Sequence, residues 1–200
     1  MSPALARFLL GLVAGAAIGF FAANMMNRQA ASPAPAPVAA TEPPAPALSA
    51  EDLATAMAAV ESRPGDFEAQ YKMGEALLRI ADRPADAVRF YERAAALRPD
   101  AVEAHVGLAD ARFASALKSG QNEVYDTALL DAAAASYTRA IALAPKTAGL
   151  RAALGMTRVI RRPPDLDGAE REFRAALEID PANELARRGL EMAAEARGSR

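Results

Sequence analysis

The chain has 200 residues, a net charge of −2 and well-mixed positive and negative side chains, so it offers no basic surface of the kind that binds nucleic acid. It has no cysteine, which excludes disulfides, thiolate metal ligands and cysteine nucleophiles. His105 is the only histidine, so a histidine-based triad or metal site would rest on one residue. We therefore expect no enzyme activity, no metal and no cofactor.

The N-terminal segment has the pattern of a membrane anchor. Residues 8–27, between Arg7 and Arg28, carry no charge, and a helix of that length spans about 30 Å, the thickness of the hydrocarbon core of a bilayer. A cleaved signal peptide is the alternative, but its apolar stretch is shorter, and residues 24–28 make a poor cleavage site. We assign residues 1–29 to a single-pass anchor in a bacterial inner membrane, with a cytoplasmic N-terminus and an exported, periplasmic C-terminal domain.

Three glycines lie on one stripe of this expected membrane helix. Gly11, Gly15 and Gly19 follow one another at four-residue spacing, which lets two membrane helices approach closely. The spacing therefore predicts that two anchors pair into a homodimer. The alternative is that glycine is simply common in membrane helices.

A proline-rich stretch follows the anchor. Residues 30–48 contain six prolines among alanine, serine, threonine and valine, a composition that favours polyproline II and cannot build a core. We expect a semi-rigid linker that holds the next domain away from the bilayer. A proline-rich recognition motif is the alternative, but no basic residue flanks these prolines.

The remainder of the chain, residues 49–200, contains internal repeats. Four prolines each end a helical pattern: Pro64, Pro99, Pro145 and Pro181. Eight residues before the last three of them stands an aromatic residue: Tyr91, Tyr137 and Phe173. Ten residues after the first three stands a small residue: Gly74, Ala109 and Gly155. Small residues let two helices approach, the aromatic residue fills the gap between them, and the proline stops the second helix.

This pattern resembles the tetratricopeptide-repeat (TPR) family, in which antiparallel helix pairs recur about every 34 residues. The resemblance runs from about Asp66 to Pro181 and implies an all-α fold, a right-handed α-solenoid of about eight helices. It implies repeats at about 66–99, 101–145 and 147–181, with capping helices at 49–63 and 182–197.

The sequence departs from the family pattern in two places. The middle unit carries roughly eleven or twelve extra residues near 113–130, with a turn around 118–122. The position where the family often has tryptophan holds polar residues: Gln70, His105 and Arg151. We expect His105 to be a partly buried structural residue. The arginines of the third unit predict a solvated basic face, or else a surface for anionic lipid or an acidic partner: Arg151, Arg158, Arg161 and Arg162.

The TPR resemblance implies that the first helix of each unit lines a concave groove in which partner peptides lie. The groove positions that we select are Tyr71, Glu75, Leu78, Val106, Asp110, Phe113, Met156 and Val159. TPR domains that clamp a C-terminal carboxylate place Lys, Arg and Asn at such positions, whereas this chain has acids and apolar residues. We therefore expect a protein or peptide partner with an apolar stripe and basic residues. The alternative is that Tyr71, Val106 and Phe113 pack inside the solenoid.

Anchor, linker and repeats together predict a membrane-tethered TPR scaffold or adaptor for envelope protein assembly or quality control. A narrower resemblance is to the TPR subunit of bacterial cytochrome c maturation, which has an exported TPR domain with an elongated middle unit, although that family typically has more than one membrane span. A self-assembling structural protein is a further alternative. An enzyme would have to use carboxylates such as Glu75 and Asp110, and no local motif marks out such a pair.

Overall fold

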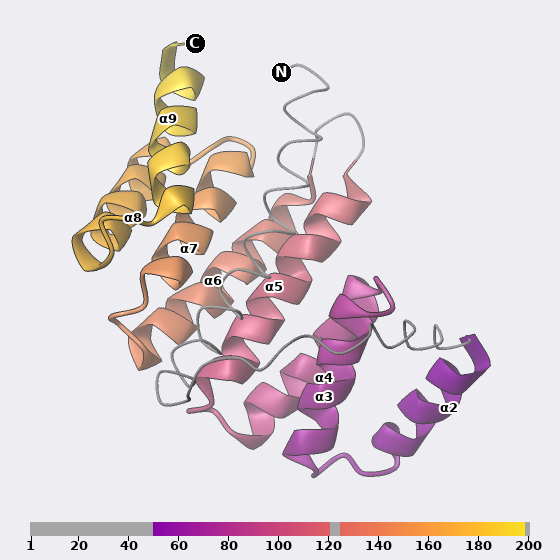
Figure 1. Cartoon of the computed structure of the whole chain (residues 1–200). Coiled ribbons are helices and arrows are strands. Elements are labelled where there is room, and N and C mark those ends of the chain that lie inside the picture. The colour runs from indigo at the N-terminus through magenta and orange to yellow at the C-terminus, as the bar shows by residue number, and fades with distance from the viewer. Residues whose placement is uncertain (1–49, 121–124, 199–200) are drawn as a thin grey trace, which may run out of the picture. The chain divides into compact units, whose positions relative to one another are not determined.

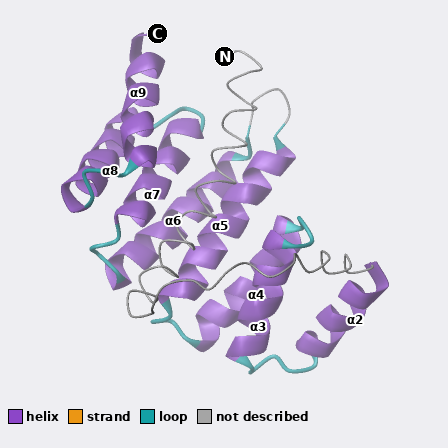
Figure 2. Ribbon diagram, viewed as in Figure 1, coloured by secondary structure: helices purple, strands orange, loops and turns teal. Residues whose placement is uncertain are grey.

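The computed structural model describes residues 50–120 and 125–198, which form eight α-helices and contain no strand (Figures 1 and 2). The helices are α2 (Ala50–Glu61), α3 (Phe67–Arg79), α4 (Pro84–Leu97), α5 (Val102–Ser119), α6 (Thr127–Leu143), α7 (Ala148–Ile160), α8 (Leu166–Ile179) and α9 (Glu184–Gly198). The described residues from Leu53 onward belong to one compact unit. The expected all-helical fold is confirmed for this part of the chain.

Several predictions concern residues outside this description. The anchor at 1–29, the linker at 30–48 and the glycines Gly11, Gly15 and Gly19 all lie outside the described residues. The extra turn of the middle unit is described only in part, because residues 121–124 fall between α5 and α6. Within the two described ranges, no helix has the length and apolar character needed to cross a membrane.

Each helix packs mainly against its neighbours in the chain. The helix pairs are α3 with α4, α5 with α6, and α7 with α8, and each pair also contacts the next (Figure 1). In addition, α3 contacts α5, and α7 contacts α9, the helix that follows the last pair. A repeat array needs this arrangement, since one helix pair alone cannot bury its apolar face.

The aromatic residue of a second helix is wedged between two first helices. Tyr91 on α4 is 2% exposed, and its ring lies against Gly74 of α3 and Gly107 of α5. Phe173 on α8 repeats this arrangement against two glycines of α7 and α9: Gly155 and Gly189. The small residues of the repeat pattern therefore serve the close approach of helices that the sequence predicts.

The polar residues at the family's tryptophan position connect each first helix to its surroundings. Gln70 is fully buried and donates from its Nε2 atom to the carbonyl groups of Val60, at the end of α2, and of Arg63, in the turn that follows. His105 Nε2 lies 3.0 Å from the carbonyl oxygen of Pro99, which gives this histidine the structural role expected of it. Arg151 of α7 pairs with Glu172 of α8 at 3.2 Å.

Candidate partner-binding surface

The predicted groove residues fall into two groups. Five are partly exposed on α3 and α5: Tyr71, Glu75, Leu78, Val106 and Asp110. We call these five residues the α3–α5 face. The other three lie in the interior, with exposed fractions of 7%, 3% and 6%: Phe113, Met156 and Val159. The last two are on α7, against which α9 packs. The binding role of all eight residues stays a prediction.

Aromatic side chains hold the α3 part of this face in place. Asp66 caps the start of α3 by accepting a hydrogen bond from the Ala69 amide at 3.1 Å, as aspartate often does at a helix N-terminus. The Tyr71 ring stacks on Phe67 with a centroid distance of 6.0 Å. It also meets Tyr91 edge-on at 5.7 Å, a favourable geometry for aromatic pairs. Tyr71 is therefore fixed by rings on two sides while part of it stays exposed.

Asp110 is the polar centre of the face. The hydroxyl group of Tyr137, on α6, donates a hydrogen bond to Asp110 Oδ1 at 2.6 Å. Burial raises the pKa of Asp110 to about 6, although the Tyr137 hydrogen bond and the positive charge of Arg79 act to lower it. Burial also raises the pKa of Tyr137, and the charge of Asp110 adds to that rise. At neutral pH the face therefore holds an ionised carboxylate that has lost part of its hydration.

The charges around Tyr71 are mainly negative. Burial raises the pKa of Tyr71 to about 12. Three carboxylates add to this rise: those of Glu75, Glu103 and Asp110. The Arg79 guanidinium opposes it, and its Nε atom lies 3.5 Å from Glu75 Oε1. The surroundings of Tyr71 thus carry an excess of negative charge at neutral pH.

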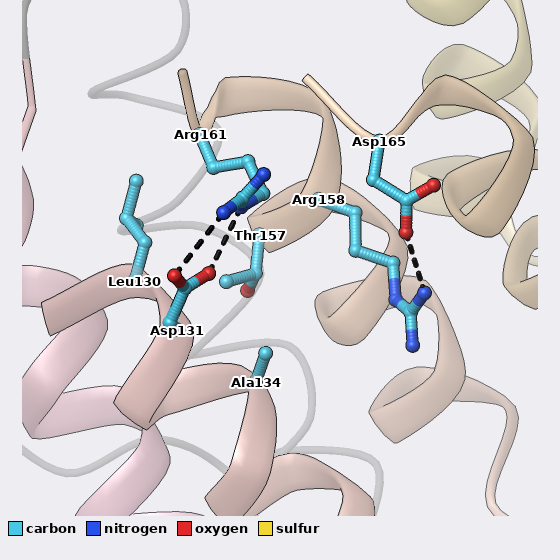
Figure 3. A pocket seen from close by; sticks show the side chains of 7 residues that line it. All are labelled: Leu130, Asp131, Ala134, Thr157, Arg158, Arg161 and Asp165. Carbon is cyan, nitrogen blue, oxygen red and sulfur yellow. Dashed lines mark hydrogen bonds and ion pairs between the residues drawn. The ribbon is translucent and has the colours of Figure 1, made fainter. Parts of the chain in front are cut away.

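A second feature, which the sequence did not indicate, is a hollow of about 320 Å³ between α6 and α7 (Figure 3). Its lining residues are Leu130, Asp131, Ala134, Thr157, Arg158, Arg161 and Asp165. Arg161 Nε pairs with Asp131 Oδ1 at 2.9 Å, and Arg158 Nη1 pairs with Asp165 Oδ2 at 2.7 Å. Because each guanidinium is matched by a carboxylate, the hollow has little net charge. Neither here nor elsewhere in residues 50–120 and 125–198 do three or more His, Asp or Glu side chains gather so as to hold a metal ion.

These ion pairs bear on the basic face that the sequence predicts for the third unit. Arg151, Arg158 and Arg161 each contact a carboxylate from another helix or turn. Arg162 bonds instead to main-chain carbonyl groups at the end of α7. Arg151, Arg158 and Arg161 therefore connect α7 to its neighbours, and their pairing with carboxylates reduces the net positive charge of the expected basic face.

Comparison with solved structures relates this arrangement to known proteins. A crystal structure of MamA protein matches with a TM-score of 0.60 and 22% sequence identity, over 74% of this chain and 72% of that one. The first TPR of Spaghetti (RPAP3), bound to the HSP90 peptide SRMEEVD, matches with a TM-score of 0.55 and 18% identity, over 66% of this chain and 93% of that one. The second TPR domain of human RPAP3, in complex with the HSP70 peptide SGPTIEEVD, matches with a TM-score of 0.51 and 17% sequence identity, over 70% of this chain and 97% of that one. The sequence matches no protein-family model and no curated protein. The described helices of this chain have the tetratricopeptide-repeat fold.

Proposed function

We propose that the chain is a scaffold that binds a segment of a partner protein on the α3–α5 face. The observation that carries this proposal is the mixture of partly exposed apolar and acidic side chains on two adjacent helices: Tyr71, Glu75, Leu78, Val106 and Asp110. An aromatic residue with apolar and charged neighbours is typical of the centre and rim of a protein interface. The buried wedge of Tyr91 between the two helices keeps this surface in one arrangement, which lowers the entropy lost on binding.

The structural relatives support a peptide-binding role. Both RPAP3 domains that share the fold were solved with bound peptides. Those peptides carry two glutamates and end in aspartate, whereas the α3–α5 face is itself acidic. Like charges across an interface oppose binding, so the partner of this chain differs in charge from those peptides.

The first two helix pairs carry the proposed surface. On α7, the residues at the matching positions, Met156 and Val159, are buried, and α9 packs against the same helix. A partner therefore meets an apolar and acidic surface on α3 and α5 but a closed one on α7. This restricts the proposed contact to a short segment.

Site-specific photocrosslinking in native membranes tests the proposal. A benzophenone amino acid replaces Val106 in the full-length chain, and a matched variant carries it at Ala135, which is exposed on α6. We expect a defined crosslinked partner from position 106 and none from position 135. Equal crosslinking at both positions, or crosslinking only at position 135, would place the partner elsewhere and refute the proposal.

We also propose that the N-terminal segment tethers this scaffold to the bacterial inner membrane, with the helical domain in the periplasm and a role in envelope protein assembly or quality control. The uncharged residues 8–27 and the prolines of 30–48 support the tether. Alkaline extraction of membranes tests it: the full-length chain stays in the pellet, whereas the double variant Ala16→Arg/Ala17→Arg is released. Release of both forms to the same extent would count against an anchor. If the anchors pair, Gly15→Leu lowers the dimeric fraction.

A further inference from the structure

We infer that the partner segment presents a lysine or arginine side chain to the α3–α5 face, and that its cation pairs with the Asp110 carboxylate. This inference rests on the proposed binding function and specifies the chemistry of the partner. It concerns a single position of the face, at which a cation completes an interaction that the chain itself leaves incomplete.

The first argument is the state of the Asp110 carboxylate. Its Oδ1 atom accepts the hydrogen bond from Tyr137 at 2.6 Å, but among the described residues no basic side chain forms an ion pair with Asp110. The side chain is only partly exposed, and burial raises its pKa. A carboxylate that is partly desolvated and lacks a cation gains more from an incoming positive charge than a solvated surface acid does.

The second argument is the charge of the surroundings. Glu75 and Glu103 add negative charge near the same site, since both raise the pKa of Tyr71. Arg79 is the basic residue that acts on Tyr71 and Asp110, and it already pairs with Glu75. The site as a whole therefore retains an excess of negative charge, which favours a cationic partner and opposes an acidic one.

The third argument is the apolar surface beside the carboxylate. Tyr71 and Val106 are partly exposed next to this group of charges. Lysine and arginine have long aliphatic stems that pack on such surfaces while the charged end reaches an acid. Apolar contacts and a carboxylate thus occur together, as a basic side chain requires.

The test measures, by NMR at pH 7.5, the binding of two small probes to the full-length chain. N-acetyl-lysine methylamide carries the cation, and N-acetyl-norleucine methylamide has the same stem without it. We expect the lysine probe to bind about fivefold more tightly, with shifts centred on Tyr71 and Asp110, since a partly buried ion pair contributes about 1 kcal/mol. Asp110→Asn removes this preference. Asp100→Asn, which makes the same charge change at an exposed residue, retains it.

The outcomes separate this inference from the proposed function. Equal binding of the two probes, no binding of the lysine probe, or a lysine preference that survives Asp110→Asn overturns the inference. In each of these cases, a partner crosslinked from Val106 would still support the binding function. A lysine preference lost in Asp110→Asn supports the inference, and the absence of any crosslink from Val106 would then refute only the proposed scaffold.

Discussion

Gly107 on α5 lies directly against the ring of Tyr91 on α4. A Cβ atom at this position would come within 2.3 Å of Tyr91 Cε1, closer than any real carbon contact allows. The ring is 2% exposed, and its other edge faces Gly74 of α3. The contact between successive helix pairs therefore depends on a glycine, even though glycine is unfavourable inside a helix.

We predict that Gly107→Ala destabilises the protein by about 1 to 2 kcal/mol, because overpacking outweighs the higher helix propensity of alanine. Denaturant unfolding measures this change. The matched control is Gly65→Ala, since no atom lies within 4 Å of a Cβ there and no described glycine has a positive φ angle. The control leaves the free energy of unfolding unchanged or raises it slightly. A stability gain in Gly107→Ala would show that the Tyr91 ring can move.

The sequence predicted the packing of the aromatic residue within each helix pair well, for a physical reason. Small residues, aromatic residues and prolines recurred in phase, and each maps onto one requirement of helix packing. Gly107 itself was missed. It stands two positions before Ala109, the small residue that the repeat pattern marks in this unit. The second contact of Tyr91 involves the next repeat unit, which a pattern within one unit does not reveal.

The candidate surface was predicted less completely. The family pattern selects positions on one side of each first helix, but it cannot show how deeply each side chain lies. Phe113, Met156 and Val159 are buried, and for the two on α7 the packing of α9 supplies a reason. The hydrogen bond between Tyr137 and Asp110 was also missed, because it joins residues 27 positions apart on different helices.

Arg112 on α5 joins two second helices, and its loss should weaken the contact between helix pairs. Its Nη2 atom bonds to Glu92 of α4 at 2.7 Å, and its Nη1 atom bonds to Ser136 of α6 at 2.8 Å. Nη1 also donates to the Ala132 carbonyl of α6 at 3.3 Å. We predict that Arg112→Met destabilises the protein by about 2 kcal/mol, since all three of these charge-assisted hydrogen bonds are lost. Glu92→Gln removes only the more exposed pair and costs less than about 1 kcal/mol. Equal losses in the two variants, measured by urea unfolding, would refute a stabilising role for the hydrogen bonds from Arg112 to α6.

The raised pKa of Asp110 makes a prediction about pH. In the folded protein its pKa is about 6, against an ordinary value of 3.8. Between these values the folded state holds a proton that the unfolded state releases, so the contribution of Asp110 to stability falls as the pH rises from about 4 to 6. Asp110→Asn has no such charge. We predict that its free energy of unfolding relative to that of the wild type rises by up to about 3 kcal/mol across this window, since each pKa unit corresponds to about 1.4 kcal/mol, and is constant above it.

Unfolding of wild type and Asp110→Asn at pH 4, 5, 6 and 7.5 measures this difference. Tyr137, which donates the hydrogen bond to Asp110, has a pKa raised above its ordinary value of 10.0, so the change between pH 4 and 6 belongs to the carboxylate. The control is Asp100→Asn, because Asp100 is exposed. A difference between Asp110→Asn and the wild type that stays constant with pH would contradict the desolvation of this residue.

Asp165 at the start of α8 uses its two oxygens for two different interactions. Oδ1 caps the helix by accepting a hydrogen bond from the Gly168 amide at 2.9 Å, and Oδ2 pairs with Arg158 Nη1 at 2.7 Å (Figure 3). Burial acts to raise the pKa of Asp165, but these hydrogen bonds and the Arg158 charge outweigh it and leave the pKa below its ordinary value. The stability from this charge is therefore present above pH 3.8 and is lost as the pH falls through the lowered pKa.

Two substitutions at Asp165 separate the cap from the ion pair. Asp165→Asn keeps a capping oxygen but removes the charge, and we predict a loss of about 0.5 kcal/mol at neutral pH. Asp165→Ala removes both interactions, with a loss of about 1.5 kcal/mol or more. Salt at about 0.5 M screens the ion pair but not the cap. It should therefore reduce the stability loss in Asp165→Asn, while the difference in stability between the two variants stays the same. Equal losses in both variants at neutral pH would mean that the Gly168 hydrogen bond adds nothing to the stability of α8.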